Sequence, residues 1–245
     1  MAEAAAGTGD FTAIGEKFRE YLTMLCGLTP HDRMLDIGCG PGRIALPLTS
    51  FLSAEGSYEG FDIQPWVIDW CRKEITSRFP SFRFQAADVF NAEYNPEGLT
   101  PASSYSFPYR PDDFDVVLAA SVFTHLMRDD AERYMREVAR VLKKTGCALL
   151  TFYLVNEEAS DLLRTTGGLD PTLRFEHDVG GGNRVSFEEA PEAAVAFEEE
   201  LLLDLLKQAG LHVEAIHYGR WCGRADFLDW QDLIVARRLA RHPTG

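Results

Sequence analysis

Runs of apolar residues alternate with amphipathic stretches along the chain, as repeated strand–helix units require. The segment 116–120 is continuously apolar, which is expected of a central parallel strand covered on both faces. Seven strands are predicted in total, at 34–37, 56–62, 82–86, 114–120, 147–155, 211–217 and 232–238. The alternation therefore predicts an α/β protein built around a mostly parallel sheet.

Apolar positions between these strands recur at helical spacing. Between the strands, four helices are predicted, over 44–52, from Pro65 to before Pro80, from Asp129 or Asp130 to near Gly146, and over 195–209 with Gly210 as its end. Residues 91–113, rich in Pro, Ser, Tyr and acidic groups, predict a long loop, which in a compact domain is more often functional than neutral.

A glycine-rich turn, Gly38-Cys-Gly40-Pro-Gly42, joins the first strand to the first helix. Glycines let the backbone take positive φ and approach a ligand, and the N–H groups that open the helix face the strand end. The dinucleotide fingerprint G-x-G-x-x-G would place its third glycine where Arg43 stands. Asp36, just before the turn, would repel a pyrophosphate but attract an ammonium group. The turn thus predicts an adenosine-bearing ligand and makes a pyrophosphate atypical.

The arrangement Asp36-x-Gly38-x-Gly40-x-Gly42 resembles the first motif of class I S-adenosylmethionine (SAM) methyltransferases. The resemblance continues through 121–126, 134–142 and 218–224, which look like a bacterial subgroup acting on small molecules, with mostly unassigned substrates. It implies an α/β fold with a seven-stranded, mostly parallel, doubly wound sheet, the last strand antiparallel, and helices on both faces. It also implies SAM as methyl donor and S-adenosylhomocysteine as product, and secondary metabolism as a setting.

Three aspartates follow successive predicted strands. Asp36 is expected near the amino-acid end of SAM, Asp62 at the ribose hydroxyls and Asp88 at the adenine amino group, although any one of them could be a turn or cap aspartate. Ligands of open α/β sheets bind above the carboxyl ends of the strands, so all three would face one crevice. The expected cofactor contacts are Asp36, Gly38, Cys39, Gly40, Gly42, Asp62, Ile63, Asp88, Val89 and Ser121.

The segment from Ser121 to Leu126 follows the fourth strand, where the reacting centre of the family lies. Methyl transfer needs an in-line nucleophile, which must lose a proton if it is a hydroxyl or an ammonium. His125 is the candidate general base, because its ordinary pKa lies near neutrality; the alternative is a structural histidine that bridges the loop. No Asn/Asp-Pro-Pro-Tyr/Phe sequence follows this strand, which argues against nucleobase and protein-glutamine acceptors.

The loops after the fourth, fifth and sixth strands should surround the mouth of the site. In an acidic protein they carry arginines that could clamp an anionic or sugar-like acceptor, with Trp221 as an apolar wall; the alternative is pairing with neighbouring acids. The arginines are Arg164, Arg174, Arg184, Arg220 and Arg224. The expected substrate-binding residues are Phe123, His177, Arg220, Trp221 and Arg224. Gly180–Gly182 predicts a flexible turn rather than a phosphate loop.

The chain is expected to form one folded unit with four regions. These are an N-terminal tail and covering helix (1–28), a SAM-binding Rossmann-like core (29–155), a substrate-side insertion or lid (156–192), and a C-terminal helix with strands that complete the same domain (193–245).

Composition narrows the possible partners. The 245 residues carry a formal net charge of −14 and no basic run, so nucleic acid is an improbable partner. No apolar run approaches the roughly 20 residues needed to cross a bilayer, and residues 1–10 lack the pattern of a signal peptide, which predicts a cytoplasmic protein. Five cysteines without a close pair predict neither disulfides nor zinc, and no metal is expected.

Three functions remain open from the sequence. The leading one is transfer of a methyl group from SAM to an O or N atom of a small molecule. A nicotinamide-dependent oxidoreductase is favoured only by the generic glycine turn. A non-catalytic SAM-binding protein would keep the cofactor residues without the chemistry. The oligomeric state is not predicted.

Overall fold

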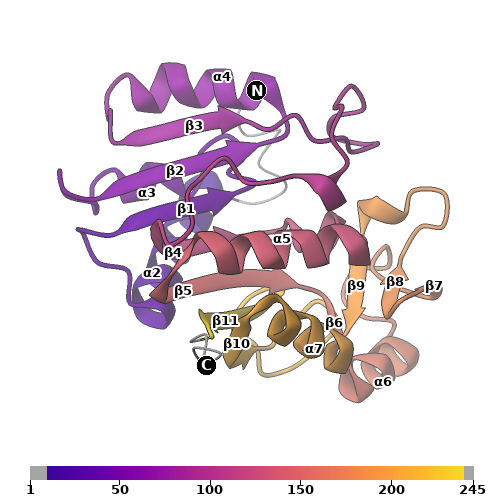
Figure 1. Cartoon of the computed structure of the whole chain (residues 1–245). Coiled ribbons are helices and arrows are strands. Elements are labelled where there is room, and N and C mark those ends of the chain that lie inside the picture. The colour runs from indigo at the N-terminus through magenta and orange to yellow at the C-terminus, as the bar shows by residue number, and fades with distance from the viewer. Residues whose placement is uncertain (1–9, 240–245) are drawn as a thin grey trace, which may run out of the picture.

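The computed structural model describes residues 10–239, and its centre is a seven-stranded sheet (Figure 1). The strand order is β10-β11-β5-β4-β1-β2-β3. The strands are β1 (Arg33–Ile37), β2 (Ser57–Asp62), β3 (Phe82–Ala86), β4 (Phe114–Ala119), β5 (Leu142–Phe152), β10 (Leu211–His217) and β11 (Asp232–Arg238). Only β11 runs antiparallel to its neighbours, β5 and β10, which confirms the predicted fold class.

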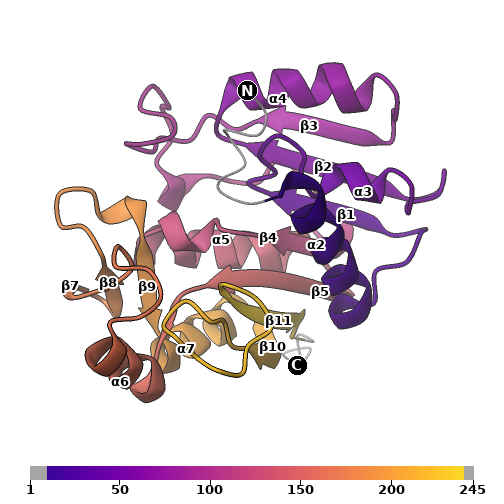
Figure 2. The ribbon, with the colours of Figure 1, turned by 180° about the vertical axis from the view of Figure 1, so that it is seen from behind.

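Helices cover both faces of this sheet, because alternate residues of each strand point to opposite sides. One face packs on α2 (Phe11–Cys26), α3 (Ala45–Leu48) and α4 (Pro65–Cys71), which continues as a π-helical turn η1 (Arg72–Thr76). The other packs on α5 (Arg128–Val141) and α7 (Glu199–Ala209). Within β1, Met34 belongs to the first core and Leu35 and Ile37 to the second. Figure 2 shows α2 and α3 on the reverse face.

A second, smaller sheet lies beyond the end of β5, in the order β6-β9-β8-β7. It is formed by β6 (Leu154–Val155), β7 (His177–Gly180), β8 (Asn183–Val185) and β9 (Val195–Glu198), with α6 (Glu157–Thr166) beside it (Figure 1). Gly180, Gly181 and Gly182 make the β7–β8 turn, all at positive φ. Short 3-10 turns complete the chain: η2 (Ala102–Ser104), η3 (Phe123–His125) and η4 (Pro191–Ala193). The segment 156–192 thus carries its own secondary structure.

Three local predictions were wrong. The predicted helix over 195–209 starts as strand β9, because residues 195–197 complete backbone hydrogen bonding with β8, and the helix begins only at Glu199. Helix α5 ends at Val141 rather than near Gly146, since Leu142 is extended and pairs with Phe114. The predicted helix over 44–52 is shortened to Ala45–Leu48, with Pro47 in its only turn.

The predicted cap of α5 was also wrong. Met127 is the N-cap residue and makes no side-chain capping bond. Asp129 and Asp130 lie inside the first turn, where a carboxylate stabilises the partial positive charge of the helix N-terminus. Asp130 also accepts hydrogen bonds from Ser103, which fastens the loop after β3 to the helix.

Candidate active site

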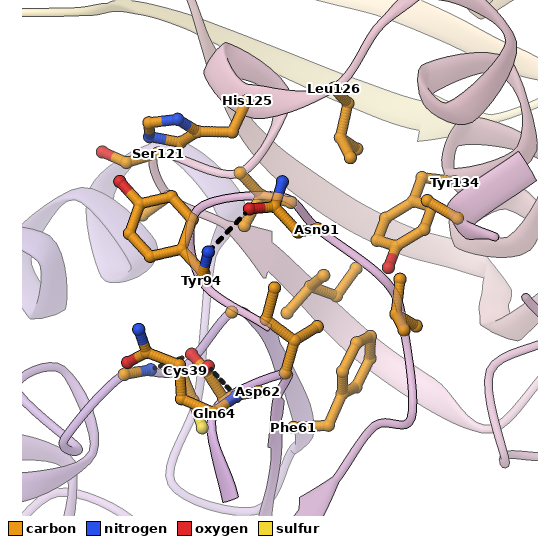
Figure 3. Close-up of a pocket in the computed structure, with 18 of the residues that line it drawn as sticks. Cys39, Phe61, Asp62, Gln64, Asn91, Tyr94, Ser121, His125, Leu126 and Tyr134 are labelled. Carbon is orange, nitrogen blue, oxygen red and sulfur yellow. Dashed lines mark hydrogen bonds between the residues drawn. The ribbon is translucent and has the colours of Figure 1, made fainter. Parts of the chain in front are cut away.

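A cavity of about 330 Å³ opens above the carboxyl ends of β1, β2 and β4 (Figure 3). The strand order reverses between β1 and β4, which is where ligands of open α/β sheets bind. The volume lies at the lower end of the range of small-molecule sites, about 300–1,000 Å³. Of the expected cofactor residues, Gly38, Cys39, Gly40, Asp62, Ile63, Val89 and Ser121 line it, and so does His125. The strand ends therefore bring residues far apart in the sequence to one crevice.

The glycine turn forms the floor of the cavity. Gly38 takes φ +68° and its N–H donates to the carbonyl oxygen of Phe61 at 2.8 Å, which ties the turn to β2. Gly40 takes φ +51°, and a Cβ added there would meet no atom within 4 Å. A side chain at Gly40 would thus enter open space at a residue that lines the cavity. Gly42 does not line the cavity; a Cβ there would lie 2.5 Å from Ile75 Cδ1, so this glycine is required by packing.

Asp62 ends β2 and turns its carboxylate to the glycine turn. Oδ2 accepts from Gly40 N–H at 2.9 Å and Oδ1 from Gln64 N–H at 2.9 Å. Burial raises the pKa of this carboxyl, and the backbone N–H groups oppose the rise. Each carboxylate oxygen has a second lone pair, so Asp62 can accept from a ribose diol while it holds the turn.

Asp36 does not reach the cavity, contrary to the expectation that it faces the amino-acid end of the cofactor. Its side chain is 1% exposed and accepts a 2.5 Å hydrogen bond from the hydroxyl of Tyr58. Burial raises the pKa of Asp36 to about 7. The charge of Asp62 adds to this rise in pKa, whereas the hydrogen bond from Tyr58 and the charge of Arg43 oppose it. Arg43, which lines the cavity, lies close enough for this electrostatic effect. Asp36 thus lies in the buried core next to residues of the site, and its carboxyl titrates near neutral pH.

Asp88 also lies outside the cavity lining, whereas its neighbour Val89 lines it. The Asp88 carboxylate is exposed and accepts from Leu99 N–H at 3.0 Å, and its carbonyl accepts from Thr100 N–H at 3.2 Å. These two bonds close the loop that follows β3. In this structure Asp88 organises the loop that covers one side of the cavity.

His125 lies in η3 and borders the cavity beside Tyr94 (Figure 3). Its Nδ1 lies 2.9 Å from the backbone carbonyl oxygen of Glu192, in η4. A carbonyl can only accept, so Nδ1 carries the proton and neutral Nε2 is left as an acceptor. Burial lowers the pKa of His125, although its bond to Glu192 and the charges of Glu93 and Glu192 oppose this. The residue is therefore held neutral, with a lone pair on Nε2.

Ser121 adopts φ +57°, which is uncommon for a residue with a side chain. Its N–H donates to Thr151 Oγ1 at 2.7 Å, and its hydroxyl lies 3.1 Å from Gln231 Oε1. Thr151 Oγ1 in turn lies 2.7 Å from the same Gln231 oxygen. These bonds from β5 and from the residue before β11 hold the strained turn that brings Ser121 to the cavity.

The loop after β3 supplies cavity residues that the sequence did not single out, namely Phe90, Asn91 and Tyr94. Asn91 Oδ1 accepts from the N–H groups of Glu93 and Tyr94, and Asn91 Nδ2 donates to Glu192 Oε2 at 2.8 Å. Tyr94 packs edge-on against His125, with ring centroids 5.3 Å apart. The only signal in the sequence was the unusual length and tyrosine content of residues 91–113. Arg43, Gln64, Leu126 and Tyr134 were also missed and line the cavity.

None of the expected substrate-binding residues lines this cavity. Phe123 is fully buried and stacks on Phe152. His177 lies on β7, with Nδ1 3.4 Å from Glu188. Arg220 is exposed and lies over the ring of Phe227 at 4.7 Å.

Trp221 and Arg224 are buried in a polar network around Asp232, so Trp221 is not the expected cavity wall. Trp221 Nε1 donates to Asp232 Oδ2 at 2.7 Å, and Arg224 Nη1 lies 3.1 Å from Asp232 Oδ1. Arg224 also pairs with Glu158. The backbone N–H groups of Leu154 and Gly219 complete the shell of Asp232, whose pKa burial raises to about 6. This network joins β11 to α6 and to the loop after β10.

Within residues 10–239, no group of three or more His, Cys, Asp or Glu side chains is arranged to hold a metal ion. In the same residues, no helix combines the length and the apolar character needed to span a membrane.

Comparison with known proteins agrees with the resemblance found in the sequence. Residues 34–146 match the family model described as a methyltransferase domain. The aklanonic acid methyltransferase DauC of Streptomyces is 30% identical over 140 residues, which cover 57% of this chain and 54% of that protein. The chain thus spans about half the length of this curated relative.

Solved structures share the fold. A SAM-dependent methyltransferase from Methanosarcina mazei superposes with a TM-score of 0.58 at 24% identity, covering 87% of this chain and 95% of that one. Magnesium protoporphyrin IX methyltransferase from Synechocystis, solved with bound S-adenosylhomocysteine, gives 0.57 at 15% identity and covers 95% and 90%. At these identities the likeness shows the fold alone.

Proposed function

We propose that the chain, whose residues 34–146 match a methyltransferase domain, is a class I SAM-dependent methyltransferase and transfers a methyl group from SAM to an oxygen or nitrogen atom of a small molecule. The observation that carries the proposal is a single cavity bordered by the Gly38–Gly42 turn, the carboxylate of Asp62 and the unprotonated Nε2 of His125. A cofactor cradle and a candidate base thus face the same space.

The residues present fit SAM. Gly40 leaves open the room that a side chain would take, Asp62 has lone pairs for the ribose hydroxyls, and Ile63 and Val89 offer apolar surfaces for the adenine. Bound there, SAM supplies an electrophilic methyl group on its sulfonium. Gly42 and Asp88 support this cradle from outside the lining, through packing and loop closure respectively.

The chain itself has two tasks in the reaction. Its walls hold the acceptor in line with the transferred methyl group and keep water out, which can supply much of the rate enhancement. His125 Nε2 accepts the proton that a hydroxyl or ammonium acceptor loses, while the Glu192 carbonyl keeps the other ring nitrogen protonated. The same hydrogen bond also supports the alternative that His125 has a purely structural role and joins η3 to η4.

Calorimetry tests the cofactor first. We expect S-adenosylhomocysteine to bind and NAD not to bind; binding of NAD alone would favour the nicotinamide-dependent oxidoreductase instead. Incubation with methyl-labelled SAM and panels of hydroxylated and amino compounds then tests transfer. Binding of S-adenosylhomocysteine without transfer to any acceptor would favour a non-catalytic SAM-binding protein.

The division into a core at 29–155 and a substrate-side lid at 156–192 is part of this proposal. Glu192, in the last turn of that segment, contacts both His125 and Asn91, which supports a lid that borders the site. The cytoplasmic location remains a prediction.

A further inference from the structure

The charges around the cavity lie at one end of it. Arg43 and Asp62 are the lining residues that carry formal charge, since burial keeps His125 neutral, and both border the glycine turn. Phe90, Asn91, Tyr94, Ser121 and His125 also line the cavity, and this set is here called the acceptor wall. Figure 3 shows Tyr94, Ser121 and His125 across the cavity from Cys39, Asp62 and Gln64. No lining residue of the acceptor wall is charged.

The acceptor wall is rich in aromatic surface. Phe90 is 46% exposed and Tyr94 39% exposed, although both border a cavity. When a ligand covers large apolar side chains that are open to a cavity, their removal from water favours binding. Tyr94 is fixed by the hydrogen bond from its N–H to Asn91 and by its edge-on contact with His125. A flat apolar body can therefore pack on a surface that is already ordered.

The polar atoms of the acceptor wall are mostly occupied. Asn91 Oδ1 accepts two backbone N–H groups, and Asn91 Nδ2 donates to Glu192. The Ser121 hydroxyl is bonded to Gln231. His125 Nε2, which is an acceptor, and the Tyr94 hydroxyl have no hydrogen-bond partner among the described residues. This inventory matches an acceptor with one or two hydroxyl groups, whereas a sugar would leave most of its hydroxyls unpaired, at a cost in affinity.

We propose, on the basis of the methyl transfer proposed above, that the acceptor is an uncharged aromatic compound whose phenolic or enolic hydroxyl donates to His125 Nε2. The charges nearby support this choice. Glu93 and Glu192 act on His125 and would repel an anion, while a cation would be repelled by the sulfonium of the methyl donor. The arginines once expected to clamp an anion do not line the cavity.

The transfer balances without a further reactant. The hydroxyl O–H bond breaks and its proton passes to His125 Nε2, while the oxygen forms a bond to the methyl carbon. The electron pair of the S–CH₃ bond remains on sulfur, which gives a neutral thioether. The imidazolium then returns its proton to water when the products leave.

Three probes on one ring skeleton test the acceptor class: 2-naphthol, 2-naphthoate and 2-naphthylmethylammonium. Their dissociation constants are measured by calorimetry on the full chain saturated with sinefungin, a SAM analogue that carries an ammonium group near the position of the sulfonium. We expect 2-naphthol to bind about tenfold or more tightly than either charged probe. Equal or tighter binding of a charged probe, or no binding of any probe to the saturated protein, overturns the acceptor class. Failure to bind S-adenosylhomocysteine would instead overturn the proposed function.

A pair of variants on one loop locates the binding surface. Tyr94→Ala should weaken 2-naphthol binding about tenfold or more, with the affinity for S-adenosylhomocysteine unchanged. Leu99→Ala is the control, because Leu99 is 83% exposed on the same loop and does not line the cavity. An unchanged affinity of Tyr94→Ala for 2-naphthol would contradict the aromatic wall.

Discussion

Nδ1 of His125 donates its proton to the backbone carbonyl oxygen of Glu192 across 2.9 Å. The two residues come from η3 and η4, and their bond joins the loop after β4 to the segment before β9. Because the acceptor is a backbone carbonyl, no substitution of the Glu192 side chain removes it directly. The tautomer of His125 is thus set by the fold.

Replacing His125 tests whether this tautomer serves catalysis. His125→Gln should lower kcat by about 10²-fold or more, the range expected for loss of a general base, with affinity for S-adenosylhomocysteine retained. The matched control is His31→Gln, since His31 is exposed and, within residues 10–239, pairs only with Ser53 and Glu55. Wild-type kcat in His125→Gln would show that the histidine is only structural.

The pH dependence of the reaction should show the ionisation of His125. Burial lowers the pKa of His125 below its ordinary value of 6.5. Nε2 accepts a proton only in the neutral form, so kcat/KM should rise with pH along a limb that lies below 6.5 and level off above it. The profile of His125→Gln should lack this limb. A limb above 7 in the wild-type protein would point to another base.

The glycine turn can be tested with two glycines of similar backbone conformation. Gly40 and Gly180 have φ +51° and +81°, and a Cβ on either would meet no atom within 4 Å. Alanine at each should cost about 1–2 kcal/mol of stability. Only Gly40 lines the cavity, so only Gly40→Ala should also weaken S-adenosylhomocysteine binding, by about tenfold or more. Equal affinities of the two variants for S-adenosylhomocysteine would contradict the assignment of Gly40 to the floor of the cofactor site.

The buried pair Asp36–Tyr58 predicts a pH-dependent effect on stability. The folded pKa of Asp36 is about 7, above its ordinary value of 3.8, so stability falls as pH rises through this window and the carboxyl ionises. The Tyr58 hydroxyl opposes this rise in pKa. Tyr58→Phe should therefore cost about 1–3 kcal/mol at pH 8 and less at pH 5, measured by denaturant unfolding.

Tyr21→Phe is the control for that measurement. The Tyr21 hydroxyl donates to the carbonyl oxygen of Leu228 at 3.0 Å, and its pKa of about 12 keeps it neutral at both pH values. Its loss should cost the same at pH 5 and pH 8. A Tyr58→Phe variant with the same pH-independence would show that Asp36 does not titrate in this range.

The sequence predicted the sheet and the floor of the site because both rest on local patterns. The apolar runs fixed the strands, and the positions after strands placed Gly38, Asp62 and Ser121 at one edge. It failed where partners distant in sequence decide the structure. Strand β9 exists because β8 offers hydrogen-bonding groups, and Tyr94 reaches the site because Glu192 holds its loop through Asn91. Neither relationship leaves a periodic signal in the residues themselves.

Arg224 illustrates the same limit, and its variant separates a structural role from substrate binding. Its side chain is 2% exposed and pairs with Asp232 and Glu158, so Arg224→Ala should cost about 3–5 kcal/mol by leaving a buried carboxylate short of a partner. At a temperature well below the unfolding midpoint of Arg224→Ala, the KM of this variant for the acceptor should equal that of the wild-type protein.

Arg220→Ala provides the comparison, because Arg220 is exposed and its contact with Phe227 is worth about 1 kcal/mol or less. This variant should leave both stability and the KM for the acceptor close to wild type. If instead both variants raised that KM, with the unfolding midpoint of Arg224→Ala unaffected, the two arginines would bind the acceptor and the uncharged acceptor would be the wrong class. A fall in the midpoint of Arg224→Ala alone assigns the arginine to the fold, because a surface clamp could be removed without loss of stability.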